Sequence, residues 1–169
     1  MDLLQKPART VSKDASPESA SYISSPGQAA TSAKAALLIE SRGLTESALD
    51  EAIVTLLAAG TRGKRLIWLN TETNDSTTVD WWNVGQRLAA KGQASLFIAT
   101  GLNAREAALA ARDTGMFLGD VIVCTDEATA CQVLADRISP SDAVLLHGVN
   151  PIAAKALLRN CEQRWQSAA

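Results

Sequence analysis

The chain of 169 residues has a single histidine, His147, which directly follows the apolar run at residues 143–146. A histidine at the end of a strand can act as a general base or bind an anionic ligand. However, no cysteine, aspartate or second histidine that could complete a catalytic set with it can be identified in the sequence. We therefore expect His147 to be a polar residue that is satisfied within the fold, with catalysis as the alternative, and we assign no catalytic residue.

Two carboxylates and two hydroxyl groups are the other candidates for chemistry. Asp126 and Glu127 are adjacent at the start of a predicted helix, where the helix dipole favours negative charge. Capping of this helix explains them better than acid–base chemistry does. Ser41 and Thr100 have no neighbouring base in the sequence, so a nucleophilic role for either hydroxyl has little support.

Residues 60–65, with the sequence GTRGKR, look like a phosphate loop. A P-loop, however, needs four residues between its glycines, a Ser or Thr after its lysine, and a position between a strand and a helix. Here Arg65 follows Lys64, and the loop leads from a predicted helix into a strand, which favours a basic turn. Residues 40–45 contain one glycine and so lack a dinucleotide-binding G-x-G-x-x-G. We predict no cofactor, and ATP only if a partner chain supplies a P-loop domain.

These residues lie among short apolar runs that alternate with longer amphipathic segments, a pattern typical of a parallel sheet with crossover helices. The apolar runs span residues 36–39, 65–69, 95–99, 121–124 and 143–146. Residues typical of helix starts precede the amphipathic segments at Thr45, Asn103, Asp126 and Asn150-Pro151, and glycines follow helix ends at Gly60, Gly92 and Gly115. The sequence therefore predicts an α/β fold with an open Rossmann-like sheet of about five strands, parallel or mostly parallel, with helices on both faces.

In an open parallel sheet, ligands bind beyond the carboxyl ends of the strands. The polar residues that directly follow the five runs should therefore meet at one edge of the sheet. We take the following residues as the candidate ligand-binding edge: Ser41, Arg42, Asn70, Thr71, Thr100, Asp126, His147 and Asn150. This edge contains no familiar catalytic set, and we predict no metal site.

Residues 1–34 are rich in Ser, Ala and Pro and contain almost no large apolar residue. Pro7, Pro17 and Pro26 break any helix in this segment. Such a segment cannot offset the entropy that it would lose on ordering. We predict a disordered tail over residues 1–34, which could be a linker, a tether or a partner-binding segment, and one α/β domain over residues 35–169.

The composition excludes several classes of protein. The chain has 16 basic and 18 acidic residues and a net charge of −2, so a basic nucleic-acid surface is not expected. No apolar run approaches the roughly 20 residues that cross a bilayer, and no leader pattern opens the chain. We predict a cytoplasmic location without membrane insertion.

Cys124, Cys131 and Cys161 lie far apart within apolar runs, which favours buried reduced thiols over a disulfide or a metal site.

Tryptophan is conspicuous in a chain with few aromatic residues. Trp68 lies within a predicted strand and should be part of the core. Trp81 and Trp82 start a predicted helix, and two adjacent indoles cannot both point inward from one helix face. We expect one of them to remain partly exposed, either as an interface anchor or as a packed residue at a helix start.

Four stretches of the chain match motifs of one known family. Residues 38–49, which begin LIES, resemble an opening strand, a D-x-Y-N-A-N-P-x-S loop and a helix, and residues 64–69 (KRLIWL) resemble the strand before G-D-M-x-E-L-G. Residues 81–85 (WWNVG) fall where the family often has H-x-x-V-G, and residues 141–148 (SDAVLLHG) resemble G-D-x-V-L-x-K-G-S-R. From about residue 35 to 165, the chain resembles the C-terminal domain of Mur ligases, closest to the member that adds D-alanyl-D-alanine to a peptidoglycan precursor.

Departures from the family pattern are concentrated at its functional positions. Residues 42–45 read RGLT where the family has N-A-N-P, and residues 70–72 read NTE where it has G-D-M. Residues 147–150 read HGVN in place of K-G-S-R, while scaffold positions such as Gly85 and Asp142 are retained. The resemblance therefore implies the family's fold with a degenerate reactive edge. Mur ligases also carry their P-loop and UDP-sugar site in two further domains, for which this chain has no room.

Three functions remain open. Our leading hypothesis is a free-standing Mur-ligase C-terminal-like domain without ligase activity of its own, which acts in binding or assembly with a link to cell-wall precursor metabolism. The first alternative is a subunit of a split ATP-dependent ligase, in which this chain positions the amino substrate. The second alternative is a Rossmann-like small-molecule binder. For the leading hypothesis we expect a protein partner or self-association.

Overall fold

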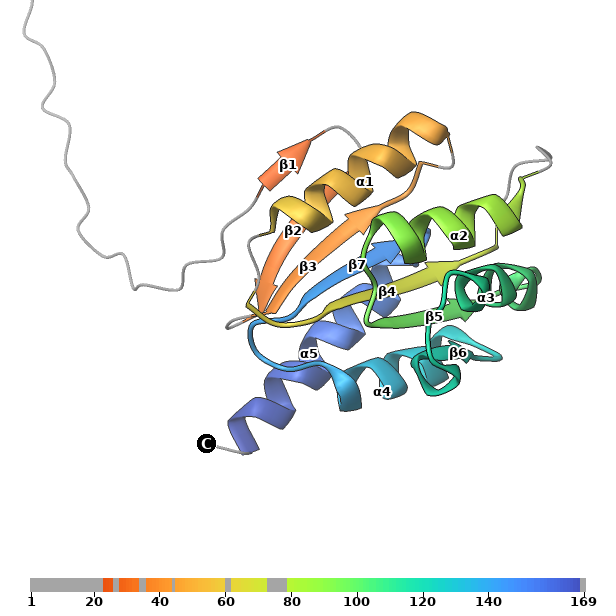
Figure 1. Ribbon diagram of the computed structural model, residues 1–169. Coiled ribbons are helices and arrows are strands. Elements are labelled where there is room, and N and C mark those ends of the chain that lie inside the picture. The colour runs from red at the N-terminus through yellow and green to blue at the C-terminus, as the bar shows by residue number, and fades with distance from the viewer. Residues whose placement is uncertain are drawn as a thin grey trace, which may run out of the picture.

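The computed structural model describes residues 23–25, 28–33, 36–43, 45–59, 62–72 and 79–167. Within them, seven strands form one sheet in the order β1-β2-β3-β7-β4-β5-β6 (Figure 1). The strands are β1 (Ile23–Ser25), β2 (Gln28–Ala33), β3 (Ala36–Ser41), β4 (Arg65–Asn70), β5 (Leu96–Thr100), β6 (Val121–Val123) and β7 (Ala143–His147). The helices are α1 (Glu46–Ala58), α2 (Trp81–Lys91), α3 (Ala104–Asp113), α4 (Glu127–Arg137), α5 (Pro151–Ser167) and the short 3-10 helix η1 (Leu118–Asp120).

The five strands β3, β7, β4, β5 and β6 run parallel, so the predicted Rossmann-like sheet is confirmed. β7 lies between β3 and β4, and its Leu145 pairs with Ile39 on one side and with Ile67 on the other. Short apolar runs form these strands because large and branched side chains suit a sheet that is covered on both faces. Every residue of β5 and β7 is accordingly buried.

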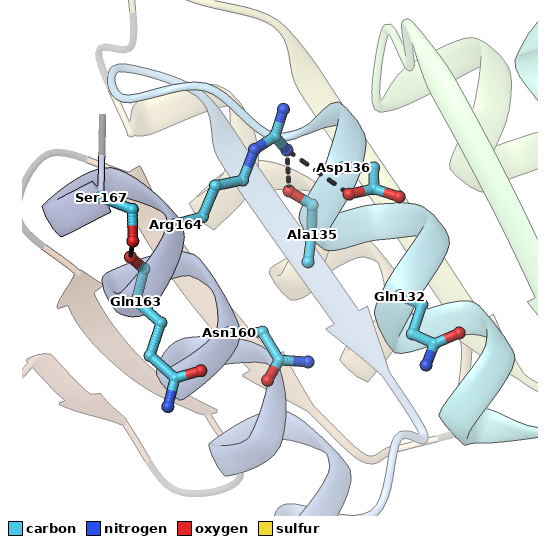
Figure 2. Close-up of a pocket in the computed structure, with 7 residues that line it drawn as sticks. All are labelled: Gln132, Ala135, Asp136, Asn160, Gln163, Arg164 and Ser167. Carbon is cyan, nitrogen blue, oxygen red and sulfur yellow. Dashed lines mark hydrogen bonds and ion pairs between the residues drawn. The ribbon is translucent and has the colours of Figure 1, made fainter.

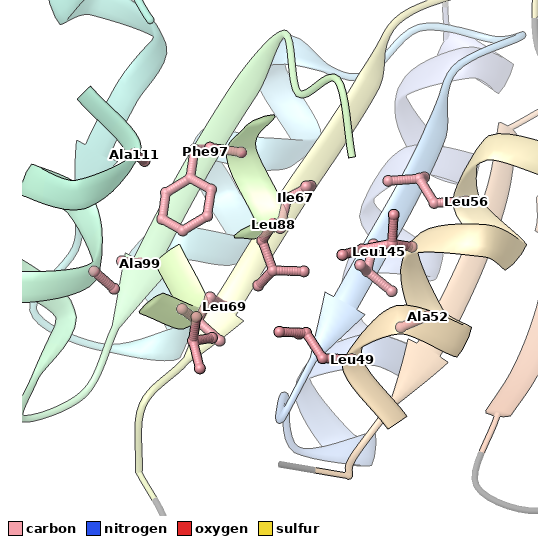
Figure 3. Close-up of a cluster of buried hydrophobic side chains, with 14 of the residues drawn as sticks. Leu49, Ala52, Leu56, Ile67, Leu69, Leu88, Phe97, Ala99, Ala111 and Leu145 are labelled. Carbon is pink, nitrogen blue, oxygen red and sulfur yellow. The ribbon is translucent and has the colours of Figure 1, made fainter. Parts of the chain in front are cut away.

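The helices divide between the two faces of the sheet. Helices α1, α2 and α3 cover one face, and α4 and α5 cover the other (Figure 1). Successive strand residues point to opposite faces, so Trp68 joins the core beneath α4 and α5, as predicted. Ile67 and Leu69 join the core beneath α1, α2 and α3 (Figure 3). With both faces covered, the ends of the strands are where polar side chains can approach a ligand.

The structure differs from the predicted tail at residues 23–25 and 28–33, which form β1 and β2. β2 pairs antiparallel with β3 from Gln28↔Ser41 to Ala33↔Ala36, and β1 pairs antiparallel with β2. The composition does not indicate these strands, because main-chain hydrogen bonds hold them and their Ser and Ala residues show no apolar alternation. Residues 23–25 and 28–33 therefore belong to the sheet, and a disordered tail over the residues before them stays a prediction. Residues 1–22 lie outside the described residues.

All four predicted helix starts are confirmed, and side-chain caps are present at three of them. Thr45 Oγ1 accepts from the Ala48 amide at 3.2 Å, Asp126 Oδ1 accepts from the Thr129 amide at 2.7 Å, and Asn150 Oδ1 accepts from the Ile152 amide at 2.9 Å. Asn103 precedes α3 without a side-chain cap. Gly92 and Gly115 follow the ends of α2 and α3, as predicted, and Gly60 lies outside the described residues.

Candidate functional site

The carboxyl ends of four strands bring predicted site residues to one edge of the sheet. Ser41, Asn70, Thr100 and His147 are the last residues of β3, β4, β5 and β7. All four are buried, from 0% exposed for His147 to 6% for Asn70. These polar side chains therefore lie beneath the surface of the edge.

Ser41 and His147 are paired across the β3–β7 ladder. Ser41 Oγ lies 3.2 Å from His147 Nδ1, and the Gly148 amide donates to the Ser41 carbonyl at 2.7 Å. The other ring nitrogen, Nε2, is buried and has no hydrogen-bond partner among the described residues. Burial lowers the pKa of His147 to about 4, so the imidazole is neutral at neutral pH. A neutral ring that is closed off from solvent holds β7 to β3 but offers no base to an external substrate.

Thr71 and Thr100 connect the loops that follow β4 and β5. Trp68 Nε1 donates to Thr100 Oγ1 at 3.1 Å, and Thr71 Oγ1 donates to the Thr100 carbonyl at 2.9 Å. Thr71 Oγ1 also accepts from the Asn103 amide at 3.0 Å. The Thr71 hydroxyl thus fixes the turn that leads into α3, and the Thr100 hydroxyl ties β5 to β4.

Glu127 joins three segments of the edge, although it was not among the predicted site residues. Its Oε1 accepts from Asn70 Nδ2 at 2.9 Å and from the Asn150 main-chain amide at 3.1 Å. Asn70 Oδ1 in turn accepts from the Glu72 amide at 3.0 Å. This carboxylate therefore ties the end of β4 to the starts of α4 and α5. No local pattern could have indicated the contact, because Asn70 and Glu127 are 57 residues apart in the chain.

Two glycines allow the edge loops to pack this closely. Gly148 has a φ of 72° and Gly101 a φ of 92°, in the left-handed region that side chains rarely adopt. A Cβ atom at Gly148 would lie 2.7 Å from the Asn70 carbonyl oxygen, and one at Gly101 would lie 2.9 Å from Asn70 Oδ1. Both positions leave no room for a side chain.

The remaining predicted edge residues are exposed. Arg42 lies 3.8 Å from Glu40 and is the only cation in the predicted set. The Thr129 amide that Asp126 caps lowers the pKa of this aspartate, so the predicted capping role of Asp126 is confirmed. Asn150 caps α5 through its side chain and binds Glu127 through its main chain.

The two adjacent tryptophans differ in burial, as the sequence predicts. Trp81 is 5% exposed and packs in the core beneath α1, α2 and α3, whereas Trp82 is 38% exposed. Trp81 is therefore not available as an exposed anchor, and an interface role for Trp82 stays a prediction.

Cys124, Cys131 and Cys161 are buried free thiols, as predicted. Among the described residues, no group of three or more His, Cys, Asp or Glu side chains is placed to hold a metal ion.

A shallow groove runs between α4 and α5. At its far end a hollow of about 490 Å³ is bordered by Gln132, Asn160 and Arg164 (Figure 2). Arg164 donates to the Ala135 carbonyl and lies 3.9 Å from Asp136, which ties α5 to α4. A second hollow, of about 390 Å³, continues the groove to Glu127 and Asn150 at the carboxyl edge, with a mainly apolar lining.

A third hollow lies at the opposite end of the strands. It has a volume of about 460 Å³ and lies among the starts of β4, β5 and β6 and the ends of α2 and α3. Lys64, Phe117 and Asp120 are on its border.

None of the helices in the described part of the chain combines the length and the apolar character of a membrane span.

Neither a family model nor a curated protein matches the sequence. Solved structures do match the architecture described above. The MurF ligase from Thermotoga maritima in complex with ADP aligns with a TM-score of 0.56 and 17% identity, over 83% of this chain and 31% of that one. A UDP-N-acetylmuramoyl-L-alanyl-D-glutamate–2,6-diaminopimelate ligase aligns with a TM-score of 0.57 and 13% identity, over 84% and 32%.

A separately solved domain matches nearly along its whole length. It is named for a UDP-N-acetylmuramate:L-alanyl-gamma-D-glutamyl-diaminopimelate ligase from Haemophilus ducreyi, and it aligns with a TM-score of 0.52 and 11% identity, over 78% of this chain and 93% of that one. This chain has a Mur-ligase-like fold. It spans about a third of the length of the two larger Mur ligases. At these identities the likeness concerns the fold alone.

Proposed function

We propose that this chain is a binding or assembly domain with a Mur-ligase-like fold and has no ligase activity of its own. One observation carries the proposal: the side chains of Ser41, Asn70, Thr71 and Thr100 at the carboxyl edge are bonded to other side chains or to the main chain. The Asn70 amide, the Glu127 carboxylate and the Thr71 hydroxyl each use their hydrogen-bonding atoms to hold edge loops together. A ligase edge needs such groups free to orient a phosphate and an attacking amine.

ATP fits this edge poorly. Transfer of a phosphoryl group needs cations, or carboxylates that hold magnesium, around the charged oxygens. Arg42 is the only cation among the predicted edge residues, and the pKa of His147, about 4, leaves the imidazole uncharged at neutral pH. Asp126 is engaged as a helix cap, and the given sequence has no P-loop.

Calorimetry with magnesium–ATP tests this proposal. We expect a dissociation constant of about 1 mM or weaker, which corresponds to about 4 kcal/mol or less of binding free energy. ADP release should stay at the rate measured without protein. The matched variants Arg42→Ala and His147→Asn should give the same heats as the wild type. A micromolar constant that either variant abolishes would overturn the proposal.

The structural alignment covers about a third of the length of each of two ligases. This favours a second candidate function, a subunit of a split ATP-dependent ligase. In that case ADP would form only when a chain with a P-loop domain, an acid substrate and an amino substrate are present together. The carboxyl edge would then hold the amino substrate, and the product would be an amide of the cell-wall precursor class. A nucleotide or amino acid that binds without turnover would instead favour a small-molecule binder.

A further inference from the structure

The most exposed aromatic side chain in the described part of the chain is Phe117. It is 81% exposed, and its neighbour Leu118 is 69% exposed. Both precede β6, at the amino-terminal ends of the parallel strands and away from the candidate site. Single apolar side chains on a surface are ordinary, but two adjacent large ones beside a hollow are typical of an interaction surface.

The hollow beside Phe117 is lined by small apolar and polar residues and has two charged residues on its border. Ala89 and Ala90 at the end of α2, Ala94 before β5 and Met116 after α3 line it together with Phe117, and Ser95 and Thr114 add hydroxyl groups. Alanines leave shallow space between the larger side chains, and the volume of about 460 Å³ exceeds that of a single aromatic side chain. The surface thus contains both a protruding aromatic ring and a space that can receive one.

The two charges on the border are placed symmetrically. Lys64 directly precedes β4, and Asp120 directly precedes β6, while Ser95 directly precedes β5, which lies between these two strands. With strands about 4.8 Å apart and a register offset of two residues, the two charged residues start about 12 Å from each other on opposite sides of Ser95. None of the ion pairs formed between described residues uses Lys64 or Asp120.

We propose that two copies of this chain pair through this surface, about a two-fold axis that passes near Ser95. Rotation by 180° about such an axis exchanges the two sides of β5. It therefore brings Lys64 of each copy opposite Asp120 of the other, and Phe117 of each copy toward the hollow of the other. An interface of this kind is self-complementary because one patch supplies both charges, the ring and the space.

The occupant is a second copy rather than an unrelated protein because nothing else is needed to complete the surface. A phenylalanine contributes about 150–250 Å² of buried area, so Phe117 and Leu118 with the lining of the hollow supply less than the roughly 800 Å² per partner of a standard interface. The pairing should therefore be weak, with a dissociation constant of about 10–100 μM. The proposal goes beyond the function proposed above and does not depend on it, since a chain with or without ligase chemistry could pair in this way.

Sedimentation equilibrium of the full chain between about 1 and 500 μM, at low salt, measures this pairing. Phe117→Ser should weaken association about 10-fold or more, because it removes the aromatic anchor. Leu102→Ser is the matched control, since Leu102 is 91% exposed and follows β5 at the opposite edge. It should leave association unchanged. A wild-type chain that is monomeric at 500 μM, or equal effects of the two variants, would overturn the proposal.

Charge reversal tests the two-fold arrangement itself. Lys64→Glu and Asp120→Lys should each weaken association about 5-fold or more, because each places like charges opposite one another. The double variant should return association to within about 3-fold of the wild type, since the pair is restored in reversed order. Melting temperatures of all variants establish that they are folded. If the folded single variants associate as strongly as the wild type, or if the double variant associates most weakly of all, the proposed two-fold arrangement is wrong.

Discussion

The two ends of the parallel strands use their side chains in opposite ways. At the carboxyl edge, Ser41, Thr100 and His147 are buried, and their hydrogen bonds run to one another or to neighbouring segments. At the amino edge, Phe117 stands exposed beside a hollow with Lys64 on its border. In this fold the carboxyl edge is the usual place for a ligand. The comparison teaches that polar residues at that edge can be structural ties, while the opposite edge leaves large apolar side chains exposed.

Gly148→Ala should cause the largest effect on the carboxyl edge, a loss of about 3 kcal/mol or more in the free energy of unfolding. The new Cβ would require a φ of 72° and would lie 2.7 Å from the Asn70 carbonyl oxygen. Denaturant titration measures this loss.

Two glycines near the amino edge serve as controls for Gly148→Ala. Gly115 has a φ of 97°, but a Cβ added there would meet no atom within 4 Å, so Gly115→Ala should cost only about 1 kcal/mol from backbone strain. Gly119 has neither a positive φ nor a close neighbour, so Gly119→Ala should change stability by less than about 0.5 kcal/mol. Equal losses at Gly148 and Gly115 would show that the edge loops can move apart and are not tightly packed.

Glu127→Ala should lower the free energy of unfolding by about 2 kcal/mol, because it leaves the Asn70 amide and the Asn150 main-chain amide without their acceptor. Glu127→Gln keeps an acceptor oxygen and should lose less. Glu106→Ala, which changes an exposed carboxylate in the first turn of α3, is the control and should cost a few tenths of a kcal/mol. A loss at Glu127 no greater than at Glu106 would contradict the role of Glu127 as a tie.

His147 should make stability depend on pH. Its pKa is about 4 in the folded chain against an ordinary value of 6.5, so between these values the unfolded chain binds more protons. Stability is therefore fully present above about pH 6.5 and falls as the pH drops toward 4, by about 2 kcal/mol between pH 7 and 5. Urea titrations at pH 5, 6 and 7 give the free energy of unfolding of the wild type and of His147→Asn, and the wild type should lose more of it as the pH falls. An equal dependence on pH in the two proteins would mean that His147 gains a proton easily and is not enclosed.

Deletion of residues 1–22 should have the smallest effect, a change in melting temperature of no more than about 2 °C, because this segment has few apolar residues to bury. Deletion of residues 1–34 also removes β2, whose pairing with β3 spans Gln28–Ala33, and should lower the melting temperature further. Thermal unfolding followed by circular dichroism compares the two deletions. A loss of about 10 °C for the shorter deletion would show that residues 1–22 pack on the domain.

The parts of this fold that sequence predicts are those set by local pattern. Buried runs such as residues 143–146 must be apolar throughout, and cap residues such as Thr45 act on amides three residues away, so both are visible in one stretch of chain. The adjacent Trp81 and Trp82 had to differ in burial for the same local reason.

Features that depend on distant contacts were not visible. β2 is held by main-chain pairing with β3 and has no apolar pattern of its own. The contact of Glu127 with Asn70 arises only once the parallel strands place their ends together. Likewise, the order of polar residues along the chain located the candidate edge, but it could not tell which side chains would be buried and bonded to their neighbours.

The position of β7 also governs how the molecule can be made. Among the described strands this one comes last in the sequence, yet it joins β3 to β4, pairing Leu145 with Ile39 more than a hundred residues earlier. Until residues 143–147 have left the ribosome, the nascent chain can hold only two separate half-sheets, β1-β2-β3 and β4-β5-β6. Each half exposes one long apolar strand edge to other chains during that time. Helix α5 packs over this seam, with Leu157 and Cys161 in the core that β3, β4 and β7 share. A chain that stops before residue 143 should therefore be prone to aggregation rather than form a smaller domain.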